Sequence, residues 1–182
     1  LQADVGPEQA EGLALPGAKA RWAEAEAAKL GRFAAVHVRS NLPSKDWPLA
    51  SFAALRDGLR ARLGLACVQV GGNGDPRVPG DLAADHRGGL AWTETAALLS
   101  RAALFVGPDS GCMHASRAVR EVPAVALWGA TSPLNSGLFG GAVANLEPAR
   151  WCAHGGRPCH ARCDWTAPCV DSVPVEEALA AA

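Results

Sequence analysis

Residues 103–119 read ALFVGPDSGCMHASRAV, in which an apolar run gives way to small and polar residues and then to helix formers. Four consecutive apolar residues before Gly, Pro and Asp are typical of a strand that is buried in a parallel sheet. A helix that starts directly after such a strand offers unpaired backbone N–H groups and the positive end of its dipole to an anion. This segment therefore predicts a strand, a phosphate-binding turn and a helix.

The same alternation of strands and helices extends to both sides of this segment. Short apolar strands are expected at residues 33–38, 65–70, 103–106 and 123–128. Helices are expected at residues 18–30, 48–63, 93–100 (capped by Thr93) and 112–119, with a short one after Pro174. Residues 81–90 are ambiguous, and most of the chain from 129 to 173 is expected to be loop. The pattern predicts an α/β fold, a Rossmann-like parallel sheet with helices on both faces.

Composition limits the classes of protein that fit. Apolar residues make up 49% of the 182 residues and charged residues 19%, so the chain can bury the core of one generous domain. The net charge of −1 gives no electrostatic case for binding nucleic acid or an anionic membrane. No apolar run approaches the length of a membrane span. The start at Leu1 has no leader pattern, so we expect no signal peptide, and it suggests a processed chain or a piece of a longer one.

Four loops follow predicted strands and should meet at one edge of the sheet. The loop at residues 107–111 contains the most informative candidate binding residues. Asp109 can accept hydrogen bonds from sugar hydroxyls, and Gly111 lets a ligand approach the backbone. His114, near the first turn of the helix, can meet a phosphate or a leaving group. The alternative is that Asp109 or Ser110 merely caps the helix and that His114 packs against the sheet.

The loop after the first strand supplies a second candidate for phosphate contact. Lys45 comes just before a predicted helix, where its charge opposes the helix dipole, and a bound anion would remove that conflict. The hydroxyl of Ser40 is a weaker candidate for the same role. Trp47 is expected to pack in the core rather than to stack on a ligand.

Several motifs occur together in one order along the chain. They are Lys45-x-Trp47-Pro48, then Gly71-Gly72, then residues 104–114, then residues 122–133 (VPAVALWGATSP). Over residues 33–175 this order resembles the C-terminal half of the heptosyltransferases, family 9 of the glycosyltransferases. The resemblance implies one half of a GT-B architecture that holds a nucleotide-sugar donor, typically ADP-heptose. It also implies transfer to a glycan acceptor such as lipopolysaccharide core, with inversion and with no metal or other cofactor.

The resemblance also assigns roles to single residues. Lys45, Ser110 and Gly111 would face the diphosphate. Asp109 and His114 would be the catalytic residues, with Asp109 toward the donor sugar and His114 toward the phosphates.

The same resemblance gives a ribose and a base region. The backbone near Leu90 would lie by the base. Relatives hold the ribose with an acidic residue after the second strand, and Asp75 is the nearest candidate. Three departures bear on which donor is used, since the family often has Pro at Cys112 and Ala130 and Gly at Glu121.

The family's acceptor-binding domain, which supplies the catalytic base, has no counterpart in the 32 residues before the first strand. The chain is therefore expected to be the donor-binding half, completed by an N-terminal domain in cis or by another chain. The expected divisions are a helical lead-in (1–32), the nucleotide-sugar-binding domain (33–150) and a Cys-rich tail with a terminal helix (151–182). The enzyme would be cytoplasmic, at the inner face of the bacterial inner membrane. The alternatives are a non-catalytic nucleotide-sugar-binding module and a structural domain that holds zinc.

Four of the six cysteines gather in the tail and leave three interpretations open. These cysteines are Cys152, Cys159, Cys163 and Cys169, with His154 and His160 among them. They can form disulfides, remain thiols or hold a structural zinc ion, although the spacing lacks a C-x2-C pair. Trp151 and Trp165 are expected to pack over this cluster.

Overall fold

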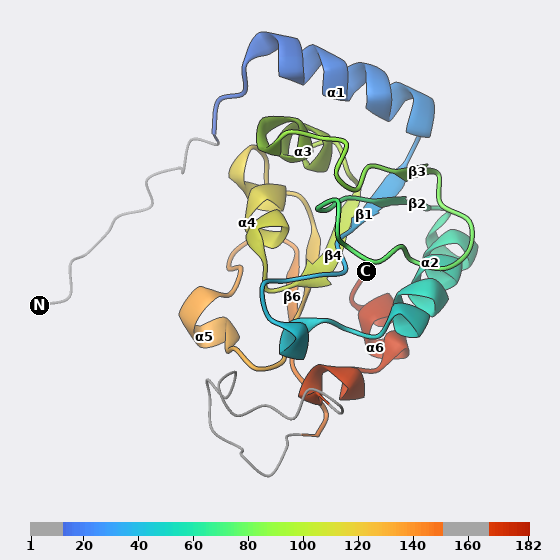
Figure 1. Cartoon of the computed structure of the whole chain (residues 1–182), viewed down its shortest axis with the longest axis vertical. Coiled ribbons are helices and arrows are strands. Elements are labelled where there is room, and N and C mark those ends of the chain that lie inside the picture. Colours follow the sequence, from blue (N-terminus) through green and yellow to red (C-terminus); the bar gives the residue numbers. More distant parts are fainter. Residues whose placement is uncertain (1–12, 151–167) are drawn as a thin grey trace, which may run out of the picture.

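A twisted parallel sheet forms the centre of the computed structural model, which describes residues 13–150 and 168–182 (Figure 1). Its six strands run in the order β3-β2-β1-β4-β5-β6, and every neighbouring pair is parallel. This order is that of a Rossmann fold and confirms the predicted fold class. The strands are β1 (Phe33–Val36), β2 (Ala66–Gln69), β3 (Ala84–Asp85), β4 (Leu104–Pro108), β5 (Ala124–Leu127) and β6 (Val143–Leu146).

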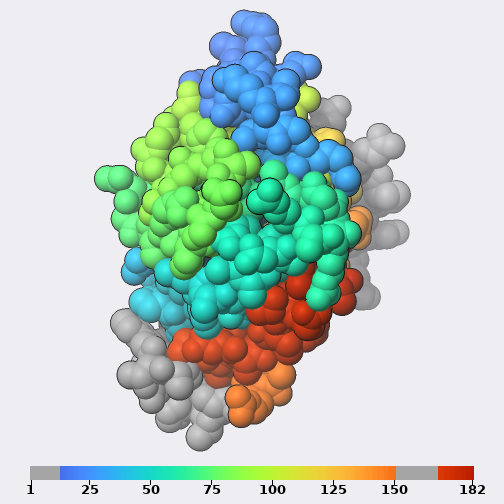
Figure 2. Space-filling view, turned by 90° about the vertical axis from the view of Figure 1, so that its right-hand side faces the viewer, coloured from blue at the N-terminus to red at the C-terminus, as the bar shows by residue number. Residues whose placement is uncertain are grey.

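Helices cover both faces of the sheet. On one face α1 packs on α3 and α3 packs on α4, whereas on the other α2 packs against α6 (Figure 1). Figure 2 shows this second face, where α2 lies between α1 at one end and the C-terminal segment at the other. The helices are α1 (Gly17–Leu30), η1 (Pro43–Lys45), α2 (Leu49–Leu63), α3 (Trp92–Leu99), α4 (Gly111–Ala118), α5 (Pro133–Ser136), η3 (Cys169–Ser172) and α6 (Val175–Ala180).

The core divides into two apolar layers, one on each side of the sheet. Strand β1 shows how the sequence builds both, because alternate side chains of a strand point to opposite faces. Phe33 and Ala35 belong to the layer under α3 and α4, and Ala34 and Val36 belong to the layer under α2 and α6. All four are buried, which explains why the strand reads as a continuous apolar run.

Two local expectations differ from the structure. Thr93 does not cap α3, since the helix begins at Trp92, and the Glu94 carboxylate accepts from the N–H of Ala91 at 2.8 Å. The described residues between 129 and 173 are mostly outside helices and strands, as expected, but they also form α5, the edge strand β6 and η3, which were not expected. Asn145 interrupts the apolar pattern of β6 but accepts a hydrogen bond from the indole N–H of Trp128 at 3.0 Å. Residues 81–90, left ambiguous above, contain the two-residue strand β3.

The described end of the tail packs onto the domain. Ala178 and Leu179 of α6 are buried in the layer beneath α2, and a Cβ at Gly58 would lie 2.5 Å from Leu179 Cδ1. Residues 151–167 lie outside the described residues, and with them three of the four tail cysteines, both tail histidines and both tail tryptophans. The expected divisions at 32/33 and 150/151 stay predictions. In the part of the chain that the structure describes, no helix has the length and apolar character needed to cross a membrane.

Candidate functional site

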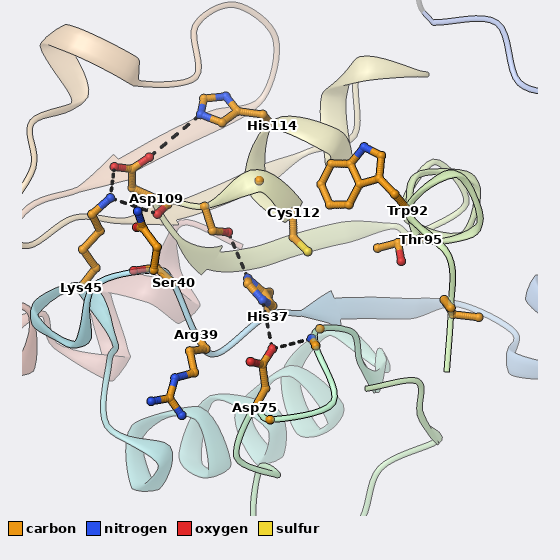
Figure 3. A pocket seen from close by; sticks show the side chains of 17 residues that line it. His37, Arg39, Ser40, Lys45, Asp75, Trp92, Thr95, Asp109, Cys112 and His114 are labelled. Carbon is orange, nitrogen blue, oxygen red and sulfur yellow. Dashed lines mark hydrogen bonds and ion pairs between the residues drawn. The ribbon is translucent and has the colours of Figure 1, made fainter. Parts of the chain in front are cut away.

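A cavity of about 930 Å³ opens at the carboxyl edge of the sheet. Its walls come from the loops after β1, β2 and β4 and from the start of α3 and α4 (Figure 3). A cavity of this size can hold a nucleotide-sized ligand. All eight residues that the sequence assigned to the donor site line it, namely Ser40, Lys45, Asp75, Leu90, Asp109, Ser110, Gly111 and His114.

Lys45 and Asp109 form a buried ion pair in this cavity. The ammonium Nζ lies 2.8 Å from Asp109 Oδ2 and 3.5 Å from the Asp109 carbonyl oxygen. The two side chains are only 9% and 11% exposed. Thr131, in the loop after β5, donates its hydroxyl to the same Oδ2 at 2.8 Å. The Asp109 carboxylate therefore holds the turn after β1 and the loop after β5 together.

This pair corrects the argument that Lys45 needs a bound anion. The residue ends η1, well before α2 begins at Leu49, and the chain itself supplies the negative charge through Asp109. An ammonium group has three N–H donors, and the two contacts to Asp109 occupy two of them. The third remains available to a ligand oxygen, so the carboxylate orients Lys45 without exhausting it.

His114 extends over the opposite side of Asp109. Its Nε2 lies 4.0 Å from Asp109 Oδ1, and its side chain is 52% exposed (Figure 3). The alternative that His114 packs against the sheet is therefore wrong. The ring projects from the first turn of α4 toward the cavity, where it can donate to a bound anion.

The N-terminus of α4 is capped as one of the sequence alternatives expected. Ser110, and not Asp109, accepts the N–H of Met113 through its hydroxyl oxygen at 3.4 Å. The first N–H groups of α4 have no acceptor within the helix and point out of its N-terminal end, which lines the cavity. Trp92 lies beside this turn, since a Cβ at Gly111 would come 3.1 Å from its Cη2.

Sequence reasoning missed His37, which connects two of the assigned residues. Its Nδ1 lies 3.0 Å from Ser110 Oγ, and its Nε2 lies 3.3 Å from Asp75 Oδ2. The same Oδ2 accepts the N–H of Gly72 at 2.8 Å. Burial lowers the pKa of His37, and the Asp75 charge and hydrogen bond oppose this shift without cancelling it. The signal that could have found His37 is its position directly after β1, but β1 was predicted to end two residues later than it does.

Ser40 and Asp46 organise the loop between β1 and Lys45. The Ser40 hydroxyl donates to the carbonyl oxygen of Leu42 and accepts the N–H of Leu42, both at 3.0 Å. The backbone N–H of Ser40 donates to Asp46 Oδ1 at 2.7 Å. Arg39 Nε lies 3.7 Å from Asp46 Oδ2. Burial raises the pKa of Asp46 more than these partners lower it. Ser40 thus lines the cavity with its hydroxyl already committed to the loop.

Cys112 also lines the cavity but is not a reactive thiol. Burial raises its pKa to about 12, and the nearby negative charge of Asp75 adds to the shift. The group is therefore a protonated thiol at neutral pH, and the thiolate is the nucleophilic form.

Within residues 13–150 and 168–182, no three His, Cys, Asp or Glu side chains are grouped closely enough to hold a metal ion. Cys169 is buried in η3. Cys152, Cys159 and Cys163, which the zinc interpretation needs, lie outside the described residues, so the three interpretations of the tail stay open.

Comparison with known proteins identifies relatives of this chain. The family model described as glycosyltransferase family 9 (heptosyltransferase) matches residues 6–162. No curated protein matches the sequence. Among solved structures, a family 9 glycosyltransferase from Veillonella parvula DSM 2008 is 21% identical and has a TM-score of 0.76, with 93% of this chain and 52% of that chain covered.

Two Escherichia coli proteins are also similar. The ADP-heptose lps heptosyltransferase II is 17% identical with a TM-score of 0.70, covering 93% of this chain and 51% of that one. The iron-containing, dodecameric heptosyltransferase TibC, solved in complex with ADP-D-beta-D-heptose, is 17% identical with a TM-score of 0.62, covering 82% and 44%.

The chain thus spans about half the length of these three proteins. At these identities the structures show a shared fold, while the family model covers most of the sequence, motifs of the cavity included. This chain belongs to glycosyltransferase family 9, the heptosyltransferase family.

Proposed function

We propose that this chain binds the nucleotide-sugar donor of a heptosyltransferase-like glycosyltransferase, acting as its donor-binding half. The observation that carries the proposal is the convergence of Lys45 and the N-terminus of α4 on one cavity, although Lys45 and Ser110 are 65 positions apart in the sequence (110 − 45). An ammonium group and unpaired helix N–H groups that face one space suit a diphosphate.

The donor would lie across the cavity with its diphosphate between Lys45 and α4. Asp109 would face the donor sugar through Oδ1, since its Oδ2 is already shared by Lys45 and Thr131. Asp75 would lie by the ribose, and the base would lie near Leu90. The two E. coli relatives carry ADP-heptose in their names or crystals, which supports that class of donor.

In the transfer, an acceptor hydroxyl oxygen attacks the anomeric carbon of the donor sugar as the bond from that carbon to the diphosphate oxygen breaks. Negative charge grows on the departing nucleoside diphosphate, and groups that are fixed in place stabilise it most. Lys45, the α4 N–H groups and His114 would do so. The hydroxyl proton goes to a general base near the acceptor. Lipopolysaccharide is the class of acceptor that the name of one relative suggests. The proposed acceptor is its core, with transfer in the bacterial cytoplasm at the inner membrane.

A second candidate function is nucleotide-sugar binding without turnover by this chain alone. It is favoured by the engagement of both carboxylates that line the cavity, since Asp75 accepts from Gly72 and faces His37, while Asp109 binds Lys45 and Thr131. Neither is placed as an unoccupied base for an acceptor. Release of ADP from ADP-heptose, measured with and without a supplied acceptor domain and acceptor, separates the two functions.

Calorimetric titration with ADP and AMP tests the proposed site. Because the β-phosphate would meet Lys45 and the helix N-terminus, we expect ADP to bind at least about tenfold more tightly than AMP, the value of one additional charge-assisted hydrogen bond. Equal affinities for the two nucleotides, or no saturable binding of ADP, would contradict the proposal.

Trp92 provides a test of where the base lies. Its side chain lines the cavity together with Leu90 and Gly111, yet the residue is 56% exposed, so its indole is accessible to a bound base. Aromatic stacking contributes about 1–3 kcal/mol per base. We therefore expect Trp92→Ala to weaken ADP binding about tenfold and Trp92→Phe to retain most of the affinity, as measured by calorimetry.

The controls for Trp92 distinguish stacking from general damage. Phe139 is 69% exposed and does not line the cavity, so Phe139→Ala should leave ADP affinity unchanged. Inorganic pyrophosphate, which has no base, should bind equally to the native chain and to Trp92→Ala. Equal loss of ADP and pyrophosphate binding in Trp92→Ala would place the base elsewhere.

A further inference from the structure

We propose that His37 is a positioning residue for the Ser110 hydroxyl: a neutral imidazole keeps the hydroxyl proton away from the cavity, and a protonated imidazole releases it to donate to a bound diphosphate. The identity of the ligand rests on the proposed function. The arrangement of His37, Asp75 and Ser110 does not rest on that function, and it can be tested without a nucleotide.

The sheet itself brings these three residues together. His37, Asp75 and Ser110 follow β1, β2 and β4, which are adjacent in the strand order β2-β1-β4. The imidazole bridges the other two at 3.0 Å on the Ser110 side and 3.3 Å on the Asp75 side (Figure 3). His37 is 8% exposed, so its contacts are to protein rather than to bulk water.

Two glycines make room for the His37 side chain. A Cβ at Gly71 would lie 3.2 Å from His37 Cδ2, and a Cβ at Gly107 would lie 3.3 Å from His37 Cβ and 2.9 Å from its carbonyl oxygen. Contacts this short would crowd His37 if either position carried a side chain. The absence of a Cβ at Gly71 and Gly107 therefore leaves the space that His37 occupies between Ser110 and Asp75.

The partners of the ring fix its neutral tautomer. A carboxylate can only accept hydrogen bonds, so the Nε2 that faces Asp75 carries the proton. In a neutral imidazole the other nitrogen, Nδ1, is then an acceptor, and Ser110 donates its hydroxyl proton to it. The Ser110 oxygen also accepts the N–H of Met113. Since a serine has one hydroxyl proton, the neutral state leaves Ser110 with no donor for the cavity.

Protonation of His37 reverses the bond to Ser110. When the ring takes up a proton from solvent at Nδ1, that nitrogen donates to Ser110 Oγ, and Asp75 balances the new positive charge. The hydroxyl proton of Ser110 must then turn away from the ring, and the cavity is the side where a diphosphate oxygen can accept it. A diphosphate therefore binds the protonated form more tightly and, by linkage, raises the pKa of His37.

The ionisable groups around the ring determine the sign of the pH dependence. Burial lowers the pKa of His37 in the unliganded chain, so the ring is neutral at pH 7 and above. Among the described residues, Asp75 is the charged group in contact with the ring. The other ionisable groups on the surrounding loops are Arg39, Lys45, Asp46, Arg87 (which donates to the Asp75 carbonyl oxygen), Asp109, Cys112 and His114. Affinity for a diphosphate should therefore rise as the pH falls through the pKa of His37.

Nitrogen NMR of the histidine rings tests the tautomer directly. At pH 7.5, without ligand, we expect His37 to carry its proton on Nε2 and to show an unprotonated Nδ1 that is shifted by a hydrogen bond. Loss of the signal in His37→Gln assigns it, and His86→Asn serves as the control for a histidine that lies outside the cavity. A His37 ring protonated on Nδ1 alone, or charged at this pH, would overturn the proposal.

Two amide variants separate the two halves of the bridge. Gln places a donor near the position of Nε2, so His37→Gln keeps the bond to Asp75 and leaves the Ser110 hydroxyl unengaged. Asn places an acceptor near the position of Nδ1, so His37→Asn keeps the Ser110 hydroxyl engaged. We expect ADP to bind His37→Gln about tenfold more tightly than His37→Asn at every pH from 5.5 to 8, as one charge-assisted hydrogen bond implies.

The ADP affinity of the native chain should change with pH between the affinities of the two amide variants. Its ADP affinity should match that of His37→Asn at pH 8 and approach that of His37→Gln at pH 5.5. Comparison at each pH cancels the ionisation of ADP itself, and Ser110→Ala should remove the difference between the His37 variants. Circular dichroism establishes that each variant folds.

The outcomes are distinguishable from failure of the proposed function. If the native chain does not bind ADP, the proposed function fails and the NMR tautomer still decides the positioning role. If the native chain binds ADP but the two amide variants follow it equally at every pH, His37 does not position Ser110. Should one amide variant fail to fold, the other and the NMR experiment decide the matter.

Discussion

Asp109→Asn is expected to lower the free energy of unfolding by about 3 kcal/mol, because it leaves the buried Lys45 ammonium without its counter-charge. Both side chains of the pair are about nine-tenths buried, and the distance of 2.8 Å between Nζ and Oδ2 is that of a direct ion pair. Removal of one partner leaves an uncompensated charge, and this costs more than the pair itself contributes. Urea denaturation at pH 7, followed by tryptophan fluorescence, measures the change.

The control for Asp109→Asn is an ion pair at the surface. Asp57 pairs with Arg56 at 2.7 Å, but its side chain is 68% exposed. Asp57→Asn should therefore change the free energy of unfolding by less than about 1 kcal/mol. The double variant Lys45→Met/Asp109→Asn removes both charges and should recover most of the stability lost in Asp109→Asn. Equal destabilisation by the Asp57 and Asp109 substitutions would show that the pair is not buried in solution.

The same double variant should bind ADP about 100-fold more weakly than the native chain, despite its recovered stability. Lys45 offers its third N–H donor and its charge to the diphosphate, and one or two hydrogen bonds from a charged group contribute about 1.5–3 kcal/mol each. Calorimetric titration of the double variant with ADP gives the affinity. Because the double variant should be more stable than Asp109→Asn and nearly as stable as the native chain, its weakened binding would not be explained by a damaged fold.

Lys29→Met is the matched control for the lysine. Lys29 lies in the last turn of α1, its side chain is 73% exposed, and its partner Glu26 lies one turn away at 2.9 Å. It does not line the cavity, so its removal should leave ADP affinity unchanged. A similar loss of ADP affinity in Lys29→Met and in the Lys45 double variant would mean that the nucleotide responds to overall charge and not to this site.

The parts of the fold that depend on residues close together in the sequence were predictable from the sequence. The turn at residues 107–111 follows an apolar run and contains the capping residue Ser110, and both signals act within a few residues. The edge strand β6 was missed because Asn145 breaks its apolar pattern, while the bond to Trp128 that accommodates this residue comes from the neighbouring strand. Pairing across a sheet is not visible in a short window of sequence.

The contents of the cavity were predictable, but its connections were not. Motif spacing placed Lys45, Asp109 and His114 on loops that meet at one sheet edge, and the structure brings them together. That Asp109 would engage Lys45 rather than remain open depends on an approach between residues 64 positions apart. His37 was overlooked because it was counted as part of a strand that ends at Val36.

A crystal structure of the chain with ADP tests the central claim most directly. The account predicts that the β-phosphate lies within hydrogen-bond distance, about 2.7–3.2 Å, of Lys45 Nζ and of the first N–H groups of α4, with the base near Trp92. A diphosphate bound instead in the smaller cavity beside Arg56 and Arg60, or one that touches neither Lys45 nor α4, would contradict it.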